Sequence, residues 1–183
     1  MPALGSTPKT VFIAWREIRL HGGTGYRRKL AFAMRKAVDG RSDAVIAVVD
    51  RDRAGRQERI RQLRNARDHA RSQGVNLPAA CGQADPHAEA WLLDDAEAVK
   101  RALQLSATAS VPSAVAGDPK QLLEALHSQS PRATDGRIDV WCDIASQVTE
   151  SRCRSPEKTG FSDFMQDVRR ELRPLARGSN ATP

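Results

Sequence analysis

The sequence predicts an α/β fold: a sheet with flanking helices, followed by a helical C-terminal extension. The clearest sign is 44–49, a continuous apolar run of the kind found in central strands that helices cover on both faces. Strand and helix patterns also alternate through residues 10–95, which favours a parallel or mixed sheet. Helical patterns dominate the rest of the chain.

Local patterns place the individual elements. Residues 10–15 are rich in β-branched and aromatic side chains, as a short strand requires. Apolar residues recur at helical spacing through 26–38, and Gly40 follows as an expected left-handed cap. Asp118 and Pro119 form a helix start. Strands are therefore expected at 10–15, 43–50 and 77–81, and helices at 26–38, 53–72, 89–105 (as one helix or two), 119–127, 138–148 and 161–175.

The length of 183 residues suits one α/β domain with a small appendage. We expect an α/β core over 1–105, a linker or mobile loop over 106–117, a helical extension over 118–176 and a disordered tail over 177–183. No apolar run approaches the roughly 20 residues of a membrane span. The N-terminus lacks a signal segment, and three scattered cysteines form no disulfide framework, so a cytoplasmic protein is expected.

The formal net charge is +7 and the pI is about 9.9. This balance favours association with a polyanion, nucleic acid first. An arginine-rich composition without any such function gives the same net charge and pI. Only the distribution of the charged residues can distinguish the two interpretations.

Two carboxylates follow the central strand. Asp50 stands where the strand emerges, at the edge where open α/β sheets bind ligands. Asp52 lies two residues on, so both carboxylates point the same way if the chain stays extended. Such a pair suits Mg²⁺ or Mn²⁺; the alternative is that both residues merely cap the next helix.

The strand-Asp-x-Asp-x-x-Gly pattern resembles the second signature of the TOPRIM fold of topoisomerases, primases and OLD-family nucleases. The string His87-Ala88-Glu89-Ala90-Trp91-Leu92-Leu93-Asp94-Asp95 resembles a block of a TOPRIM-like family, domain of unknown function 4276. Gly117-Asp118-Pro119-Lys120 is similar to a short turn found downstream in that family. The similarity covers roughly 22–126.

The resemblance implies a Rossmann-like TOPRIM-type sheet and a metal-assisted phosphoryl-transfer ancestry. It makes Asp50 and Asp52 metal ligands and places Glu89 near the same sheet edge. Members of this family often stand near ATPases in gene sets for defence against phage. TOPRIM proteins also open with a strand that leads to a glutamate, and no Glu-Gly follows the strand at 10–15. Either the opening strand is missing, or Glu17 has taken a compensating position.

Basic side chains give a second set of candidates. At about 100° per residue, five arginines after the strand fall in one arc, where they would contact a nucleic-acid backbone or simply cover apolar surface. Arg28 and Lys29, after a glycine-rich loop, are auxiliary phosphate candidates. The five arginines are Arg53, Arg56, Arg64, Arg67 and Arg71.

Two local features favour structural roles. Trp91, followed by two leucines, is expected to anchor the core. His87-Ala88-Glu89 matches half of the zinc deaminase signature, but the Pro-Cys-x-x-Cys half is absent. No serine, cysteine and histidine arrangement suggests a covalent nucleophile.

These patterns together predict a TOPRIM-like, Mg²⁺-dependent nuclease or phosphoryl-transfer protein acting on nucleic acid, with Glu89 or Glu17 as the acid/base. The alternative is a non-catalytic subunit that binds nucleic acid or an ATPase partner. A nucleotide-binding sensor is a third option.

Overall fold

The structure is a computed structural model that describes residues 11, 13–19, 25–52, 55 and 57–178. Two parallel strands, β1 and β2, form the sheet, with Val45 paired to Ala79 and Asp50 to Ala84. Eight α-helices and one short 3₁₀ helix complete the described part of the chain. The elements are α1 (Tyr26–Asp39), β1 (Val45–Asp50), α2 (Glu58–Ser72), β2 (Ala79–Ala84), α3 (Glu89–Asp94), α4 (Ala96–Ala102), α5 (Pro119–Ser128), α6 (Arg137–Gln147), η1 (Glu150–Arg152), α7 (Pro156–Thr159) and α8 (Phe161–Gly178).

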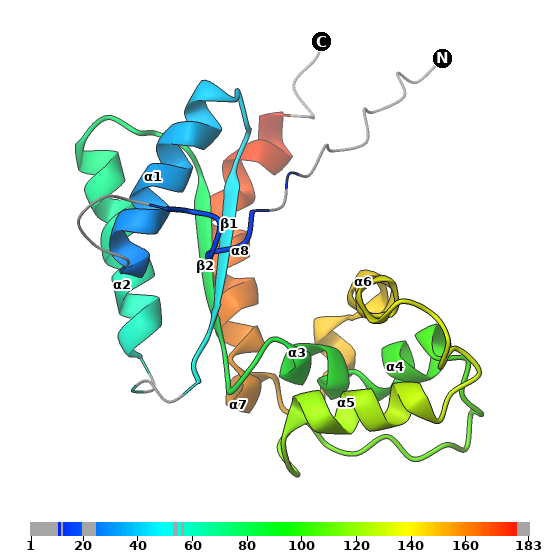
Figure 1. The fold of residues 1–183 in the computed structure, drawn as a ribbon. Coiled ribbons are helices and arrows are strands. Elements are labelled where there is room, and N and C mark those ends of the chain that lie inside the picture. Colours follow the sequence, from blue (N-terminus) through cyan, green and yellow to red (C-terminus); the bar gives the residue numbers. More distant parts are fainter. Residues whose placement is uncertain (1–10, 12, 20–24, 53–54, 56, 179–183) are drawn as a thin grey trace, which may run out of the picture.

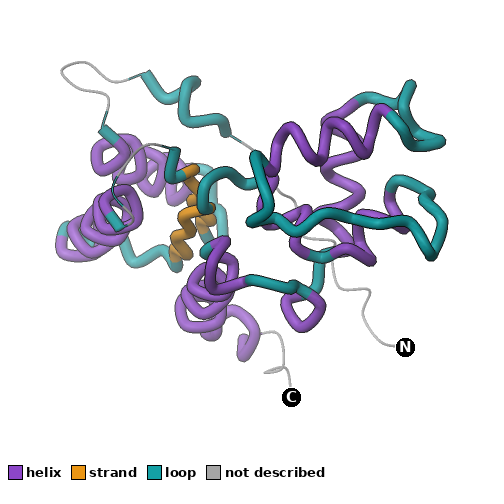
Figure 2. Tube along the Cα trace, turned by 90° about the horizontal axis from the view of Figure 1, so that it is seen from below, coloured by secondary structure: helices purple, strands orange, loops and turns teal. Residues whose placement is uncertain are grey.

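The sheet lies between two helical layers. Helices α1 and α2 lie on one side of it and α8 on the other, while α3 to α6 form a separate group beyond the ends of the strands (Figures 1 and 2). The α/β class is therefore confirmed, in the form of a small two-stranded parallel sheet with flanking helices. No helix in the described residues is long and apolar enough to cross a membrane.

One hydrophobic cluster joins the sheet to α1 and α2. Leu30 and Met34 of α1 and Leu63 of α2 are fully buried there against Ala47 and Val49 of β1. The opposite face of β1 is less covered than the sequence predicted, since Ile46 is 58% exposed. The reason is that α8 packs mainly on β2 and leaves part of β1 uncovered.

The close approach of α8 to β2 depends on a glycine. A Cβ atom added to Gly82 would lie 2.6 Å from the Phe164 ring and 2.9 Å from the Trp91 ring. The Trp91 indole stacks on Phe164 and donates a hydrogen bond to the Thr159 carbonyl at 2.7 Å. Trp91 is 8% exposed, so the expected core role is confirmed.

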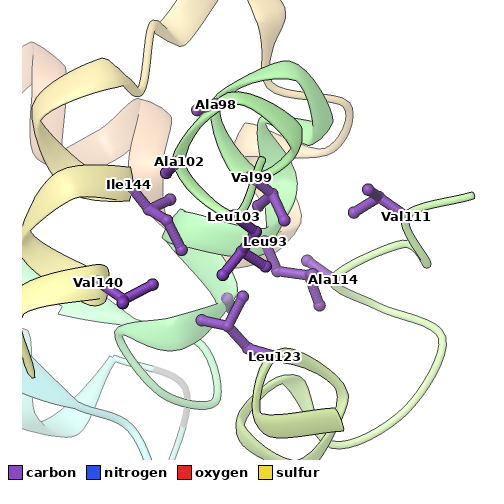
Figure 3. Close-up of a cluster of buried hydrophobic side chains, with 11 residues drawn as sticks. Leu93, Ala98, Val99, Ala102, Leu103, Val111, Ala114, Leu123, Val140 and Ile144 are labelled. Carbon is purple, nitrogen blue, oxygen red and sulfur yellow. The ribbon is translucent and has the colours of Figure 1, made fainter. Parts of the chain in front are cut away.

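A second hydrophobic cluster unites α3 to α6 (Figure 3). Leu93, Leu103, Leu123 and Ile144 are all fully buried in it. It includes Ala114 from 106–117, a segment without helix or strand that nevertheless buries side chains against α3 and α5. The cluster therefore contains residues from both sides of position 105, the expected end of the α/β core.

Arg154 fixes that segment in place. Its guanidinium donates to the carbonyl oxygens of Leu93 at 2.8 Å, Val111 at 2.9 Å and Pro112 at 2.7 Å. The fully buried Asp94 accepts the backbone N–H of Ser155 at 3.0 Å. The end of α3 therefore connects the group α3 to α6 with the segment that leads into α7 and α8.

Asp95 is a second buried acid at this end of α3. It caps α4 by accepting the Ala98 N–H and also pairs with Arg152. Burial raises the pKa of its carboxyl, but the Arg152 side chain and the N–H groups of Thr149 and Ala98 outweigh that effect and hold the pKa below its ordinary value.

Several boundary predictions are wrong. The described residues of 10–15 form no strand: 15–17 make a turn, and the Trp15 indole donates to the β1 carbonyl of Val48 at 2.6 Å instead of pairing its backbone with β1. Helix α1 ends as expected, but the left-handed conformation falls on Arg41 (φ 53°) and Gly40 has φ −80°. The second helix begins at Glu58 rather than at residue 53, and the second strand is 79–84 rather than 77–81.

Candidate metal centre

The carboxyl ends of β1 and β2 bring two distant segments together. Asp50 is the last residue of β1, and its register partner Ala84 is the last residue of β2. The chain then runs through 85–88 into α3, so this loop lies directly against the end of β1. Arg51 ties the two segments by donating to the Asp85 carboxylate at 2.9 Å. The sheet edge expected to hold the site is therefore built from both strands.

The Asp50 carboxylate is held by one of its two oxygens. Oδ1 accepts a hydrogen bond from the Ala88 N–H at 2.9 Å, and Oδ2 lies 3.9 Å from Nδ1 of His87. Burial raises the pKa of this carboxyl above its ordinary value; the Ala88 N–H opposes that rise, and the negative charges of Glu89 and Asp52 add to it. A bound cation would be favourable at this place, because its positive charge would offset the repulsion among the carboxylates of Asp50, Asp52 and Glu89.

The Asp52 carboxylate is arranged in the same way. Its Oδ2 accepts from Nη1 of Arg59 at 2.6 Å, and its Oδ1 lies 3.3 Å from Nδ1 of His87. The backbone is not extended as the sequence suggested, since Asp52 has φ 46°. A left-handed residue at this point turns the chain, and the turn still brings Asp52 beside Asp50.

Arg59 and Tyr26 support this arrangement. The Arg59 guanidinium also donates to the backbone carbonyl of Asp50 at 2.6 Å and lies over the Tyr26 ring, 5.4 Å from its centroid. The Arg59 side chain of α2 therefore contacts both aspartates and the first residue of α1.

The three side chains can offer ligand atoms to one ion. Asp50, Asp52 and His87 each offer an atom within 4.8 Å of the other two, and they are the group with this property among the described residues. Around an octahedral ion with bonds of about 2.1 Å, neighbouring ligand atoms lie about 3 Å apart. The separations of 3.3 and 3.9 Å need only small side-chain rotations to reach that spacing. The donor set, two hard oxygens and one imidazole nitrogen, fits a divalent cation.

His87 is the member of this group that the sequence did not predict as a metal ligand. In the sequence it stands at the start of the TOPRIM-like block and in half of a deaminase signature. The available signal was its position directly after the second strand, because the carboxyl ends of adjacent parallel strands meet at one edge of a sheet. A strand prediction that ended at 81 rather than 84 hid that proximity.

The two predicted glutamates are in different situations. Glu89 begins α3, is half-buried and lies close enough to Asp50 for its charge to raise that residue's pKa. Glu17 is exposed, and its carboxylate accepts a 3.4 Å hydrogen bond from the Ala14 N–H of its own turn. The structure thus brings Glu89, but not Glu17, to the three-residue group.

The predicted arginine stripe faces α8. Arg67 is 5% exposed and pairs with Asp167 and Glu171 of that helix, and Arg71 pairs with Glu171. Arg64 lies 3.9 Å from the Asp167 carboxylate. These charges neutralise acids of α8, so phosphate binding by this stripe stays a prediction that the packing does not favour. Arg53 and Arg56 lie outside the described residues.

The two basic candidates on α1 also differ. Lys29 is half-buried and donates to the backbone carbonyl of Trp15 at 2.7 Å. Arg28 is on the exposed side of the helix. The glycine-rich loop before them, 21–24, lies outside the described residues.

A cleft of about 180 Å³ lies between the start of α2, β2 and α7–α8, and none of the three residues of the candidate centre lines it. Its lining mixes charges, including Asp85, Lys158 and Glu157. Cys81 also lines it, but burial raises the pKa of this thiol to about 12, outweighing the nearby Arg67. A thiol with that pKa is no nucleophile at neutral pH.

Comparison of the chain with family models, with curated proteins and with solved structures finds no match. The TOPRIM-like resemblance therefore stays a prediction from the quoted motifs.

Proposed function

We propose that this protein is a divalent-metal-dependent phosphodiesterase of the nuclease type, acting on nucleic acid with Mg²⁺ or Mn²⁺. One observation carries the proposal. Asp50 and Asp52 each have one carboxylate oxygen tied by an N–H donor, and each directs its second oxygen toward His87. Two carboxylate oxygens and one imidazole nitrogen directed at one place are a donor set that suits a divalent cation.

The residues have distinct parts in this proposal. Asp50, Asp52 and His87 hold the ion, and Arg59 orients Asp52. A bound divalent ion would neutralise charge on the scissile phosphate and lower the pKa of a coordinated water. Glu89 is the carboxylate best placed to accept a proton, since it lies at the start of α3 beside Asp50.

The test is cleavage of labelled single- and double-stranded DNA and RNA by the purified protein in Mg²⁺, in Mn²⁺ and in EDTA. We expect cleavage that needs the metal and that Asp50→Asn reduces at least a hundredfold. Asp39→Asn, which changes an exposed carboxylate at the far end of α1, is the matched control and should cleave like the wild type. Equal cleavage by wild type and Asp50→Asn would overturn the proposal.

A second candidate is a non-catalytic subunit that binds nucleic acid or an ATPase partner. The position of Glu17 favours it, because this exposed residue is bonded to its own turn and does not supply the acid/base group that the TOPRIM resemblance implies. Proton transfer by such a group contributes about 10²–10⁴-fold to a rate. Metal and nucleic-acid binding without any cleavage would select this candidate over the enzyme.

A further inference from the structure

Phe32 is an aromatic side chain that contacts no other ring among the described residues. It lies on α1 and is 38% exposed. Each of the other described aromatic residues packs against another ring: Trp15 on Tyr26, Trp141 on His127, and Trp91 with Phe161 and Phe164. In a chain with only 4% aromatic residues, an exposed ring without a ring partner on a helix surface is unusual.

The side chains around this ring are cationic. Lys36 lies over the Phe32 ring, 5.8 Å from its centroid. Arg28 and Arg35 stand four residues before and three after it, the spacings that place helix side chains on the same face. Arg28, Arg35 and Lys36 are all exposed. We call Phe32 with these three basic residues the α1 platform.

Helix α1 itself carries little negative charge. Helix α1 has Asp39 as its one acidic residue, against five basic ones. Among the described residues, neither Arg35 nor Lys36 lies in an ion pair with a carboxylate. The contrast is with α2, where Arg67 and Arg71 are already paired with acids of α8.

The same helix begins at the candidate metal centre. Tyr26, its first residue, contacts Arg59, which in turn pairs with Asp52. Six residues at about 1.5 Å each separate Tyr26 from Phe32, so the α1 platform begins within about 10 Å along the helix from that contact.

We infer that the α1 platform binds single-stranded nucleic acid, with an unpaired base stacked on Phe32 and the backbone phosphates on Arg28, Arg35 and Lys36. Rings surrounded by cations bind single strands in this way, because every base has a π-face and every nucleotide a charge. Duplex DNA keeps its bases stacked inside and gives the ring nothing to contact. The inference names the substrate class of the proposed nuclease and rests on that function, although binding itself needs no metal.

The test is binding of a fluorescent 12-nucleotide single strand and of its duplex, measured by anisotropy in EDTA so that cleavage plays no part. We expect the single strand to bind more tightly than the duplex. Phe32→Ala should weaken single-strand binding about five- to a hundredfold, as loss of one base–aromatic stack does. Arg35→Gln should reduce the slope of log affinity against log salt by about 0.7.

Two variants serve as controls. Ile138→Ala removes another exposed apolar side chain, on α6, and Lys120→Gln removes an exposed charge on α5. Both should bind like the wild type, while Phe32→Trp should retain binding and show indole fluorescence quenched by the strand. Thermal unfolding confirms that each variant is folded.

The outcomes separate this inference from the proposed function. No single-strand binding by the wild type at low salt, or equal binding by Phe32→Ala and the wild type, would overturn the inference. A loss of the same size in Ile138→Ala would do so too. Single-strand binding that depends on Phe32, without cleavage in Mg²⁺ or Mn²⁺, would support the inference and contradict the proposed nuclease activity.

Discussion

The guanidinium of Arg67 lies 2.9 Å from the Asp167 carboxylate, although the two residues are 100 positions apart in the chain. The side chains are 6% and 1% exposed, and Asp167 also accepts the N–H of Cys81 in β2 at 2.8 Å. This pair joins α2, β2 and α8 and fixes the last helix to the sheet.

Asp167→Ala should therefore destabilise the fold by about 3 kcal/mol, because it leaves the buried Cys81 N–H without its acceptor and removes one of the two α8 carboxylates that pair with the buried Arg67. Denaturant unfolding measures the loss. Asp163→Ala, which changes an exposed acid on the same helix, should cost little. A small effect of Asp167→Ala would show that the other contacts of α8, including the Glu171 ion pairs and the Phe164 ring, are enough to hold it.

Acid should loosen the same helix through Glu171. Burial raises the pKa of this carboxyl, but hydrogen bonds from Arg71 and Arg170 and the charge of Arg67 outweigh burial and hold the pKa below its ordinary value of 4.5. A lowered folded-state pKa contributes stability that is present above 4.5 and is lost as pH falls through the folded-state value. The free energy of unfolding, followed from pH 7 to pH 3, should fall less steeply in Glu171→Gln than in the wild type. Glu97→Gln, on the exposed side of α4, should follow the wild type.

His87→Ala should change which metal the centre prefers. Imidazole binds transition ions better than it binds Mg²⁺, so Mn²⁺ affinity should fall about tenfold and Mg²⁺ affinity should fall less. Calorimetric titration of the full chain with each ion gives the two affinities. His69→Ala is the control, because this exposed histidine lies in the last turn of α2, at the opposite end of the helix from Arg59. Unchanged affinities for both ions would mean that His87 is not a ligand.

Arg59→Gln tests whether the arginine orients Asp52 or competes with the ion. We expect metal affinity to fall about tenfold, the size of effect seen when a residue that holds a ligand is removed. Oδ1 of Asp52 points to His87 while Oδ2 is held by Arg59, and free rotation of the carboxylate would lose that alignment. The control is Arg61→Gln, an exposed arginine on the same helix. Tighter metal binding in Arg59→Gln would identify the arginine as a competitor.

Gly82→Ala should cost about 2 kcal/mol of stability, since the new methyl group would meet the Phe164 and Trp91 rings at less than 3 Å. The melting temperature measured by circular dichroism reports the loss. Gly117→Ala makes a fair comparison, because its Cβ would meet Leu122 at an ordinary 3.6 Å. Similar melting temperatures for the two variants would mean that α8 moves away from β2 at little cost.

Local patterns in the sequence determined much of this protein. The apolar run at 44–49 predicted β1, the helical spacing of Leu30 and Met34 predicted α1, and Asp118 with Pro119 predicted the start of α5. Each of these depends on neighbouring residues only, through side-chain periodicity or capping. Asp50 at the strand end was predictable for the same reason, because an acid that follows a buried run has to stand where the strand leaves the core.

The tertiary structure alone decided the rest. Whether the α2 arginines meet phosphate or protein depended on where α8 packs, and Asp167 and Glu171 of that helix are 100 residues away from their partners. The place of His87 beside Asp50 and Asp52 depended on the register of two strands, which brings 85–88 to the end of β1. Periodicity and capping describe a chain's neighbours in sequence, whereas a ligand set and an ion pair are formed by neighbours in space.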